Sequence, residues 1–163
     1  MKILVPILAG LLMAAPALAE SHDPLAPTGD IAAGEKAFKK CIACHVVRDG
    51  DGNTLAGRKG KSGPNLYALA GNTAGTVEGY KYGKSMVKAG EGSDDFEPLV
   101  WSEETFVGYV MDPKKFLREY LGDKKARAKM TFRVKKEEDA KNLYAFLHSL
   151  APPMAAEDTE ASN

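Results

Sequence analysis

The pentapeptide CIACH, residues 41–45, contains both cysteines of the 163-residue chain and one of its three histidines. Two cysteines at this spacing can exchange redox equivalents, bind a metal, close a local disulfide or attach a prosthetic group. Each of these chemistries needs a particular compartment and particular partner residues elsewhere in the chain. The rest of the sequence therefore decides what the pentapeptide does.

The N-terminus indicates export from the cytoplasm. The stretch MKILVPILAGLLMAAPALA carries one positive charge, Lys2, followed by an apolar run and the small residues Ala17-Leu18-Ala19. This order predicts a secretory signal peptide over residues 1–19. Two prolines and a glycine interrupt the apolar run, which is shorter than the ~20 residues that a membrane span needs. We expect a mature periplasmic chain that begins at Glu20 and has no membrane anchor.

The composition indicates one domain of balanced charge. Removal of 19 residues from 163 leaves 144, enough for one domain. Basic and acidic residues both number 22, and cleavage removes Lys2 and no acid, so the mature net charge is −1. This balance does not indicate nucleic acid as a partner. The polar, proline-containing ends predict a flexible segment over 20–29 and a disordered tail over 151–163, around a folded domain at 30–150.

The pattern within this domain predicts an all-α fold of about five short helices joined by long loops, with no convincing strand. Asp30 and Ser102 precede apolar residues at helical spacing and are good N-caps. Asp112-Pro113 ends one helix and begins the next. Residues 49–92 hold most of the glycines and are expected to be mainly loop. The expected helices are residues 30–41, 64–71, 101–110, 113–121 and 137–150.

These surroundings argue against three uses of the pentapeptide. A redox dithiol would follow a strand of a βαβ unit, and no such unit is expected. A zinc site would need a second ligand pair, but no further cysteine exists, and His22 and His148 lie near the ends. A disulfide between Cys41 and Cys44 would close too small a loop to add much stability. Covalent haem attachment remains, because thiols about one helical turn apart match the two vinyl groups of one haem edge, with His45 beneath the ring.

Methionine is the best available ligand for the second axial position of such an iron, because thioether sulfur is soft. Met154 lies in the tail and Met86 in the glycine-rich loop. Met111 falls on the periodic face of a helix, where a methionine usually packs in the core. Met130 lies in the polar segment KARAKMTF, far along the chain from His45. Met130 is therefore the preferred candidate.

Several motifs resemble those of one protein family, the class I c-type cytochromes. The matching motifs are GEKAFKKCIACH at 34–45, GPNLY at 63–67, GYKYG at 79–83, KMTF at 129–132 and NLYAFL at 142–147. The chain is most similar to the mitochondrial-like group, which includes the larger soluble cytochromes of purple and denitrifying bacteria. The match runs from about Gly29 to Leu150. The resemblance implies the cytochrome c fold, wrapped around one covalently attached haem c.

The resemblance also implies which residues contact the haem. Cys41 and Cys44 carry the thioethers, His45 is the proximal iron ligand and Met130 is the sixth ligand. The carbonyl of Pro64 is expected to accept the N–H of the proximal histidine and so to orient its ring. An iron with two protein ligands has no open position for a substrate.

A second set of residues is implied at the haem periphery. Tyr82 and Trp101 match positions that hydrogen-bond a buried haem propionate, and Tyr109 matches the tyrosine beside the axial sulfur. Two positions depart from the family pattern. Asn72 stands where an arginine is common, and Ala128 stands where a threonine is frequent. Both departures weaken the polar support around the propionates.

The function implied by the resemblance is one-electron transport by a soluble periplasmic carrier, and not enzymatic catalysis. Such a carrier shuttles electrons from a quinol-oxidising cytochrome bc-type complex to a terminal oxidase, a reductase or a photosynthetic reaction centre. The alternative is a haem enzyme or a gas-binding c-type haem protein, which would need an open distal site.

The lysines indicate how such a carrier, expected to be a monomer, would dock. The resemblance brings one set of lysines around the exposed haem edge: Lys40, Lys114, Lys115, Lys129, Lys135 and Lys136. A one-sided basic patch orients a protein toward an acidic partner and speeds their encounter. We therefore expect acidic docking surfaces on membrane redox complexes as partners. The alternative is a set of solvated lysines with no such role.

Overall fold

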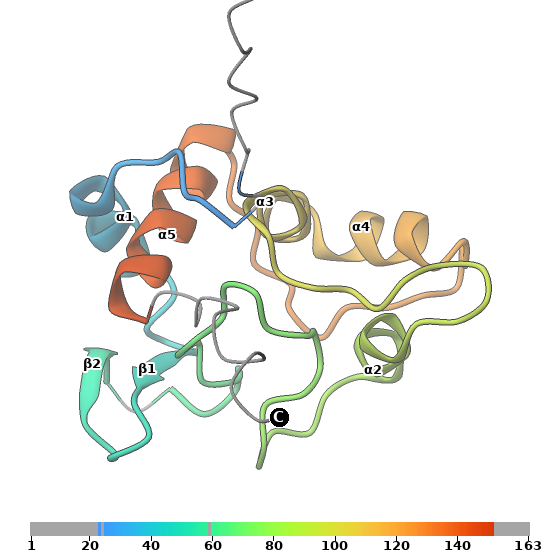
Figure 1. The fold of residues 1–163 in the computed structure, drawn as a ribbon, viewed down its shortest axis with the longest axis horizontal. Helices are drawn as coiled ribbons and strands as arrows, with labels where there is room; N and C mark the ends of the chain where they lie inside the picture. The colour runs from blue at the N-terminus through green and yellow to red at the C-terminus, as the bar shows by residue number, and fades with distance from the viewer. Residues whose placement is uncertain (1–22, 24, 59, 152–163) are drawn as a thin grey trace, which may run out of the picture.

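The computed structural model describes residues 23, 25–58 and 60–151. Its elements are α1 (Ile31–Phe38), β1 (Val46–Arg48), β2 (Thr54–Gly57), α2 (Lys84–Glu91), α3 (Glu103–Met111), α4 (Pro113–Tyr120) and α5 (Glu137–Leu150). Long irregular segments connect these short elements (Figure 1). The fold is therefore helical with little sheet, as the sequence predicts. The predicted signal peptide, and the predicted tail beyond Ala151, lie outside the described residues.

The packing of α1 against α5 forms one side of the molecule (Figure 1). The side chain of Asp30 caps α1 by accepting a backbone N–H at 2.6 Å, as the sequence predicts. A Cβ at Gly34 would overlap the backbone of Asn142, so glycine lets the two helices approach closely. One turn further along α1, the ring centroid of Phe38 lies 5.4 Å from that of Phe146.

The helices α3 and α4 are consecutive and meet at Asp112-Pro113. Ser102 and Thr105 form a capping box at the start of α3. Asp112 ends α3 and caps α4, because its side chain accepts the N–H of Lys115 at 3.0 Å. Pro113 occupies the first turn of α4, where its missing N–H costs nothing. The predicted boundary between these helices is confirmed.

Two apolar clusters fill the interior. The larger one includes side chains of α1, α3 and α5, among them Phe106 and the fully buried Tyr144. The smaller one includes side chains of α2 and α4, among them the fully buried Leu117. Trp101 and Tyr109 contact both clusters. The two halves of the interior are therefore joined through these two aromatic side chains.

The helix predicted over residues 64–71 is wrong. The segment contains turns and no helix, and the N–H of Gly71 donates to the carbonyl of Trp101 at 3.0 Å. The N–H of Leu66 donates to the carbonyl of Val46 at 2.9 Å, and the side chain of Asn65 makes two hydrogen bonds to the backbone of Arg48. These partners lie in another segment, so helical spacing of apolar residues does not reveal them.

Three further elements are absent from the sequence-based prediction. The strands β1 and β2 form a short antiparallel hairpin, whose loop is held by hydrogen bonds to the side chain of Asp49. Three- and four-residue strands are too short to show an alternating pattern. The helix α2 lies within the glycine-rich stretch and buries Met86 and Ala89. Its Gly90 packs against the carbonyl of Ala74, so this glycine serves close packing and does not break the helix.

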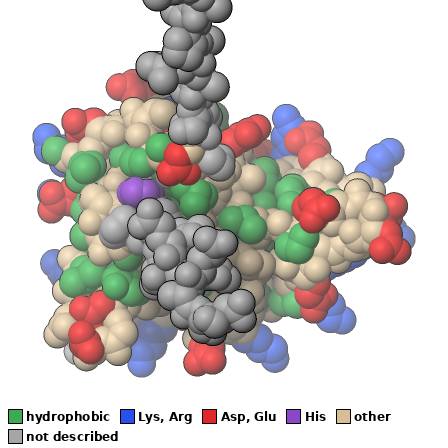
Figure 2. Space-filling view, in the orientation of Figure 1, with side chains coloured by type: hydrophobic (Ala, Val, Ile, Leu, Met, Phe, Trp, Pro, Cys, Tyr) green, Lys and Arg blue, Asp and Glu red, His purple; other side chains and the backbone are tan. Residues whose placement is uncertain are grey.

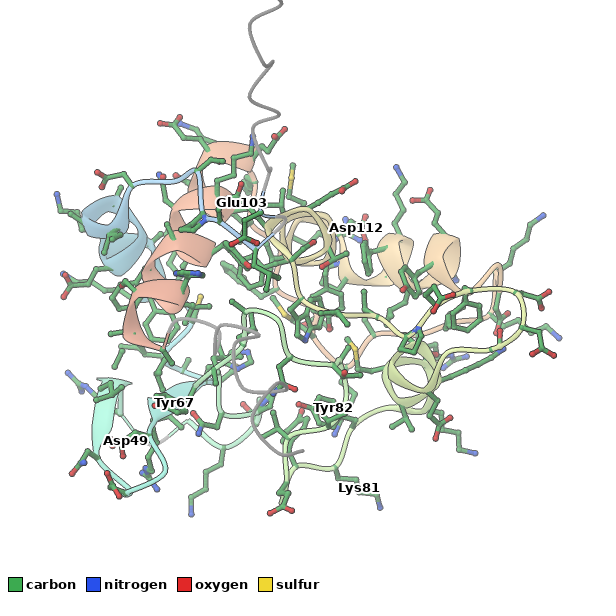
Figure 3. The ribbon with its side chains drawn as sticks, in the orientation of Figure 1. Asp49, Tyr67, Lys81, Tyr82, Glu103 and Asp112 are labelled. Carbon is green, nitrogen blue, oxygen red and sulfur yellow. The ribbon has the colours of Figure 1, made fainter. Side chains whose placement is uncertain are left out.

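Residues 25–29, which belong to the segment predicted to be flexible, contact α3 and α5. The N–H and hydroxyl of Thr28 donate to the carboxylate of Glu103 at 2.8 and 2.7 Å. The hydroxyl of Tyr144 donates to the carbonyl of Leu25 at 3.1 Å. Glu103, labelled in Figure 3, is only 9% exposed, and these bonds satisfy its buried charge.

Replacement of Gly34 by alanine tests the close contact of α1 with α5. The added methyl group would meet the backbone of Asn142, and overpacking of this kind costs about 1–3 kcal/mol. We expect the free energy of unfolding, measured by guanidinium titration, to fall by that amount. Gly50→Ala is the control, because a Cβ there meets no atom within 4 Å. Equal stability of the two variants would contradict the close contact.

Candidate functional site

A cavity of about 420 Å³ lies where the two apolar clusters meet. Its walls come from the turn after α1, the loop at 62–69, the loop at 80–83, α3 and the segment before α5. A volume of this size is in the range of ligand-binding pockets. The fold therefore brings residues that are distant in the sequence to one space large enough for a ligand.

The CIACH turn supplies one wall of the cavity. The N–H of Cys41 donates to the carbonyl of Phe38 at 2.8 Å, and that of His45 donates to the carbonyl of Cys41 at 2.9 Å, so the turn continues from α1. Cys41, Cys44 and His45 all line the cavity, and neither cysteine forms a disulfide. Burial, supplemented by Cys44 and opposed by Lys40, raises the pKa of the Cys41 thiol to about 11. This is not the low-pKa thiol of a redox dithiol.

The ring of His45 is fixed by two neighbours. Its Nδ1 donates to the carbonyl of Pro64 at 2.9 Å, which confirms the predicted hydrogen bond. A Cβ at Gly63 would lie 2.6 Å from Nδ1, so only glycine fits against the ring. Burial lowers the pKa of His45, although the bond to Pro64 acts in the opposite direction. The imidazole is therefore neutral at neutral pH, and its Nε2 is free to bind a metal.

The structure narrows the candidates for a sixth ligand to two methionines. Met130 and Met86 line the cavity. Met111 packs against the larger apolar cluster, as the sequence predicts, and His148 lies in the last turn of α5 away from the cavity wall. Met86 is a buried member of the smaller cluster, whereas Met130 belongs to the irregular segment between α4 and α5. His22 and Met154 lie outside the described residues.

The aromatic residues predicted at the site also line the cavity. These are Tyr82, Trp101 and Tyr109. The rings of Trp101 and Tyr109 lie 5.2 Å apart, and Tyr82 belongs to the loop that leads into α2 (Figure 3). Burial raises the pKa of both tyrosines, so their hydroxyl groups remain protonated and can donate hydrogen bonds. The structure therefore brings all three predicted side chains to one cavity.

Tyr80 and Arg127 line the same cavity, although the sequence pattern predicts no role for either residue. Tyr80 is part of the quoted motif GYKYG, and Arg127 lies three residues before Met130. Arg127 brings a guanidinium group to the cavity, whose wall also includes the amide of Asn72. The short distance along the sequence from Arg127 to the predicted ligand Met130 was the signal that could have indicated a role for Arg127.

The chemistry of the cavity wall fits a haem. Two thiols, one neutral imidazole and two thioethers stand among apolar side chains, and the described part of the wall contains no carboxylate. Arg127, Lys129 and the hydroxyl of Tyr82 suit the acidic substituents of such a group. The described residues contain no cluster of three or more His, Cys, Asp or Glu that could hold a bare metal ion. The wall therefore suits an iron held in a broad apolar ring.

Comparisons with known proteins agree with this chemistry. No family model matches the chain. Cytochrome c2 of Cereibacter sphaeroides is 49% identical over 93% of this chain and 98% of its own length, and cytochrome c-550 of Paracoccus versutus is 42% identical over 94% and 92%. The crystal structure of cytochrome c2 from Rhodobacter sphaeroides matches 76% of this chain and 97% of its own, with 54% identity and a TM-score of 0.70.

The chain belongs to the class I c-type cytochromes. The five helices in the described part of this cytochrome are consistent with the cytochrome c fold of its relatives. It carries one covalent haem c with histidine and methionine ligation, and it transports electrons. The haem of this family is thus the group whose chemistry the cavity wall fits.

Loss of the two cysteines tests how far the fold depends on the haem. An unfilled cavity costs about 24 cal/mol per Å³, so about 420 Å³ corresponds to roughly 10 kcal/mol, comparable with the whole stability of a domain. We expect Cys41→Ala/Cys44→Ala, expressed in the periplasm with haem maturation, to give no stable helical protein by circular dichroism. Cys44→Ala, which keeps one thioether, is the control and should fold. A well-folded haem-free double variant would contradict this dependence.

Proposed function

We propose that Cys41 and Cys44 bind the haem through thioether bonds and that His45 and Met130 are its iron ligands. The observation that carries this assignment is the convergence of these four side chains on one cavity. The bond from His45 to Pro64 supports the ligand role, because it orients the ring and leaves Nε2 free. We prefer Met130 to Met86 as the ligand. Met86 is a buried member of the smaller apolar cluster, whereas Met130 is half-buried in an irregular segment.

Tyr82 and Trp101 are the proposed hydrogen-bond donors to a haem propionate. Both side chains line the cavity, and both carry a donor group on a largely apolar body. Arg127 and Lys129 add positive charge to the same wall. Asn72 also lines the cavity, where its amide can replace part of the polar support that an arginine would supply.

When bound, the haem supplies the one-electron Fe(III)/Fe(II) couple. The residues of the chain then set its environment. His45 and Met130 are neutral ligands, so they add no charge to the iron, and side chains such as Phe38, Leu66 and Leu143 surround the site with apolar wall. Neutral ligands in an apolar pocket favour the reduced state and raise the reduction potential. Because both axial positions are taken by side chains, we infer that the protein is not an enzyme.

We further propose a periplasmic monomer. Residues 1–19 act as a signal peptide and the haem domain covers residues 30–150, with residues 25–29 bound to α3 and α5. No helix in the described part of the chain is long and apolar enough to cross a bilayer. In the periplasm the protein would shuttle electrons from a quinol-oxidising cytochrome bc-type complex to a terminal oxidase, a reductase or a photosynthetic reaction centre.

A basic rim around the cavity supports docking to acidic surfaces of such complexes. Lys40, Arg127 and Lys129 line the cavity, and we call them the basic rim. Lys114 and Lys115 line a separate hollow beside α4, so they are not part of this rim. Figure 2 shows acidic and basic side chains mixed around the margin of one face. The basic rim is therefore the best-supported docking surface.

Substitution of the methionines tests the ligand assignment. Met130→Ala should keep the covalent haem but lose the weak red charge-transfer band of ferric Fe–S coordination and bind cyanide more readily. Met111→Leu and Met86→Leu keep the side-chain volume, so each should keep the native spectrum. Loss of the band in Met86→Leu, with the band retained in Met130→Ala, would show that Met86 is the ligand. High-spin bands in the unaltered protein would favour an open distal site.

Salt dependence tests the basic rim. We expect the second-order rate of electron transfer to membranes from the source organism to fall steeply as salt rises from low values to about 0.15 M, where screening acts over ~8 Å. Arg127→Glu should slow association more than Lys88→Glu, which changes an exposed lysine of α2 outside the cavity wall. Rates that ignore ionic strength, or equal rates for the two variants, would mean that docking is apolar.

A further inference from the structure

Residues 25–29, which we call the N-terminal strap, run from beside α3 to the start of α1 (Figure 1). The N–H and the hydroxyl of Thr28 each donate to one carboxylate oxygen of Glu103, at 2.8 and 2.7 Å. The next residue, Gly29, packs so closely against α5 that a Cβ there would overlap the backbone of Lys141. The strap is therefore bound to two helices.

Glu103 is a buried carboxylate that has no part in the haem chemistry described above. It is the first residue of α3, where a negative charge is favourable because it faces the helix N-terminus. The next residue, Glu104, has the same benefit while its side chain stays exposed to water. Burial of a carboxylate is costly unless its oxygens accept hydrogen bonds, and both oxygens of Glu103 accept theirs from Thr28. The strap, and not the helix alone, therefore accounts for the burial of Glu103.

Two contacts of the strap end beside Trp101, the only tryptophan of the chain. Glu103 follows Trp101 by two residues. The hydroxyl of the fully buried Tyr144 donates to the carbonyl of Leu25 at 3.1 Å and lies 3.5 Å from the carbonyl oxygen of Trp101. Trp101 itself lines the haem cavity. The strap therefore braces the backbone that carries this part of the cavity wall.

Other contacts hold Trp101 from a different direction. Its N–H donates to the carbonyl of Asn72, and its carbonyl accepts the N–H of Gly71, both at 3.0 Å. Its ring lies 5.2 Å from that of Tyr109. The loop at 71–72 thus pairs with the backbone of Trp101, whereas the strap holds the turn that leads from Trp101 into α3.

We propose that the N-terminal strap positions Trp101 as a hydrogen-bond donor to the haem and so raises the reduction potential of this cytochrome. Thr28, Glu103 and Tyr144 are positioning residues, because they act through Trp101 and do not line the cavity. The proposal rests on the role of Trp101 as a propionate donor, proposed above. A donor offsets part of the negative charge of a propionate, which otherwise favours Fe(III). Loosening of the strap therefore lowers the potential.

Thr28→Val tests the strap without a change of charge. It keeps a β-branched side chain but removes the hydroxyl bond to Glu103. We expect the reduction potential of the purified holoprotein to fall. We also expect exchange of the indole N–H hydrogen of Trp101 with solvent, measured by NMR, to become about three- to tenfold faster. Thr28→Ser keeps the hydroxyl, so it should retain the native values of both quantities.

Glu103→Gln separates position from charge. Its amide nitrogen cannot accept a hydrogen bond, so one bond from Thr28 is lost. Loss of a negative charge by itself raises the potential, because it disfavours Fe(III). Glu104→Gln is the matched control, because it makes the same change of charge at the neighbouring exposed residue. We expect a lower potential and faster indole exchange in Glu103→Gln than in Glu104→Gln.

Two further variants test whether the effect belongs to the strap. Tyr144→Phe keeps the ring and removes the bond to Leu25, so it should change both values in the same direction as Thr28→Val. Thr54→Val changes an exposed residue of β2 outside the cavity wall and should change neither. Lower stability to guanidinium in Thr28→Val and Tyr144→Phe, with native potential and indole exchange, would overturn the proposal, because the strap would then only stabilise the fold.

Trp101→Phe distinguishes failure of the strap from failure of the proposed role of Trp101. An unchanged potential in Trp101→Phe would refute the donor role of the indole, and with it the strap. A lower potential in Trp101→Phe, with native potentials in Thr28→Val and Tyr144→Phe, would refute the strap alone. In a Trp101→Phe background, Thr28→Val should cause no further fall in potential, because the strap acts through the indole.

Discussion

The close contact of α1 with α5 at Gly34 is the constraint on which the site depends. Because α1 continues directly into the CIACH turn, the position of this helix sets the position of both thiols and of His45. The helix α5 contributes Leu143 and Leu147 to the same cavity. This helix pair thus contributes to both the larger apolar cluster and the haem pocket, so core packing and cofactor binding are coupled.

The electrostatics of the site follow from burial. The pocket wall is apolar where it faces the iron ligands, and burial keeps the imidazole of His45 neutral and the hydroxyls of Tyr82 and Tyr109 protonated. Positive side chains occur at the rim, and no carboxylate belongs to the described wall. The iron ligands are neutral, the hydroxyl groups can donate to the acidic haem substituents, and cations lie at the rim. This combination suits an electron carrier, which changes its charge by one unit and binds no substrate.

The two sides of the pocket are stabilised in different ways. The histidine side is held by the turn after α1, by the bond to Pro64 and by the close fit of Gly63. The Met130 side is an irregular segment, held by single hydrogen bonds to Ser85 of α2, to the carbonyl of Lys81 and to Val110 of α3. Local contacts of this kind open at lower free energy than the core does, so any loss of an axial ligand is expected first on the methionine side.

The sequence by itself determined the features that depend on neighbouring residues. Asp30, Ser102 and Asp112-Pro113 mark helix boundaries because caps and prolines act within one turn. The motif CIACH indicated haem attachment because its chemistry requires that spacing. The family resemblance added Tyr82, Trp101 and Met130, all of which line the cavity.

Only the tertiary structure decided features whose partners lie far along the chain. The stretch 64–71 resembles a helix, but its polar groups bond to β1. The glycines of α2 resemble loop residues, but Gly90 is required where α2 passes the backbone of Ala74. Lys129 resembles a solvated lysine, yet its amine is bound to the loop at 80–83. In each case the deciding contact joins segments that the sequence keeps apart, and a local pattern carries no information about such a contact.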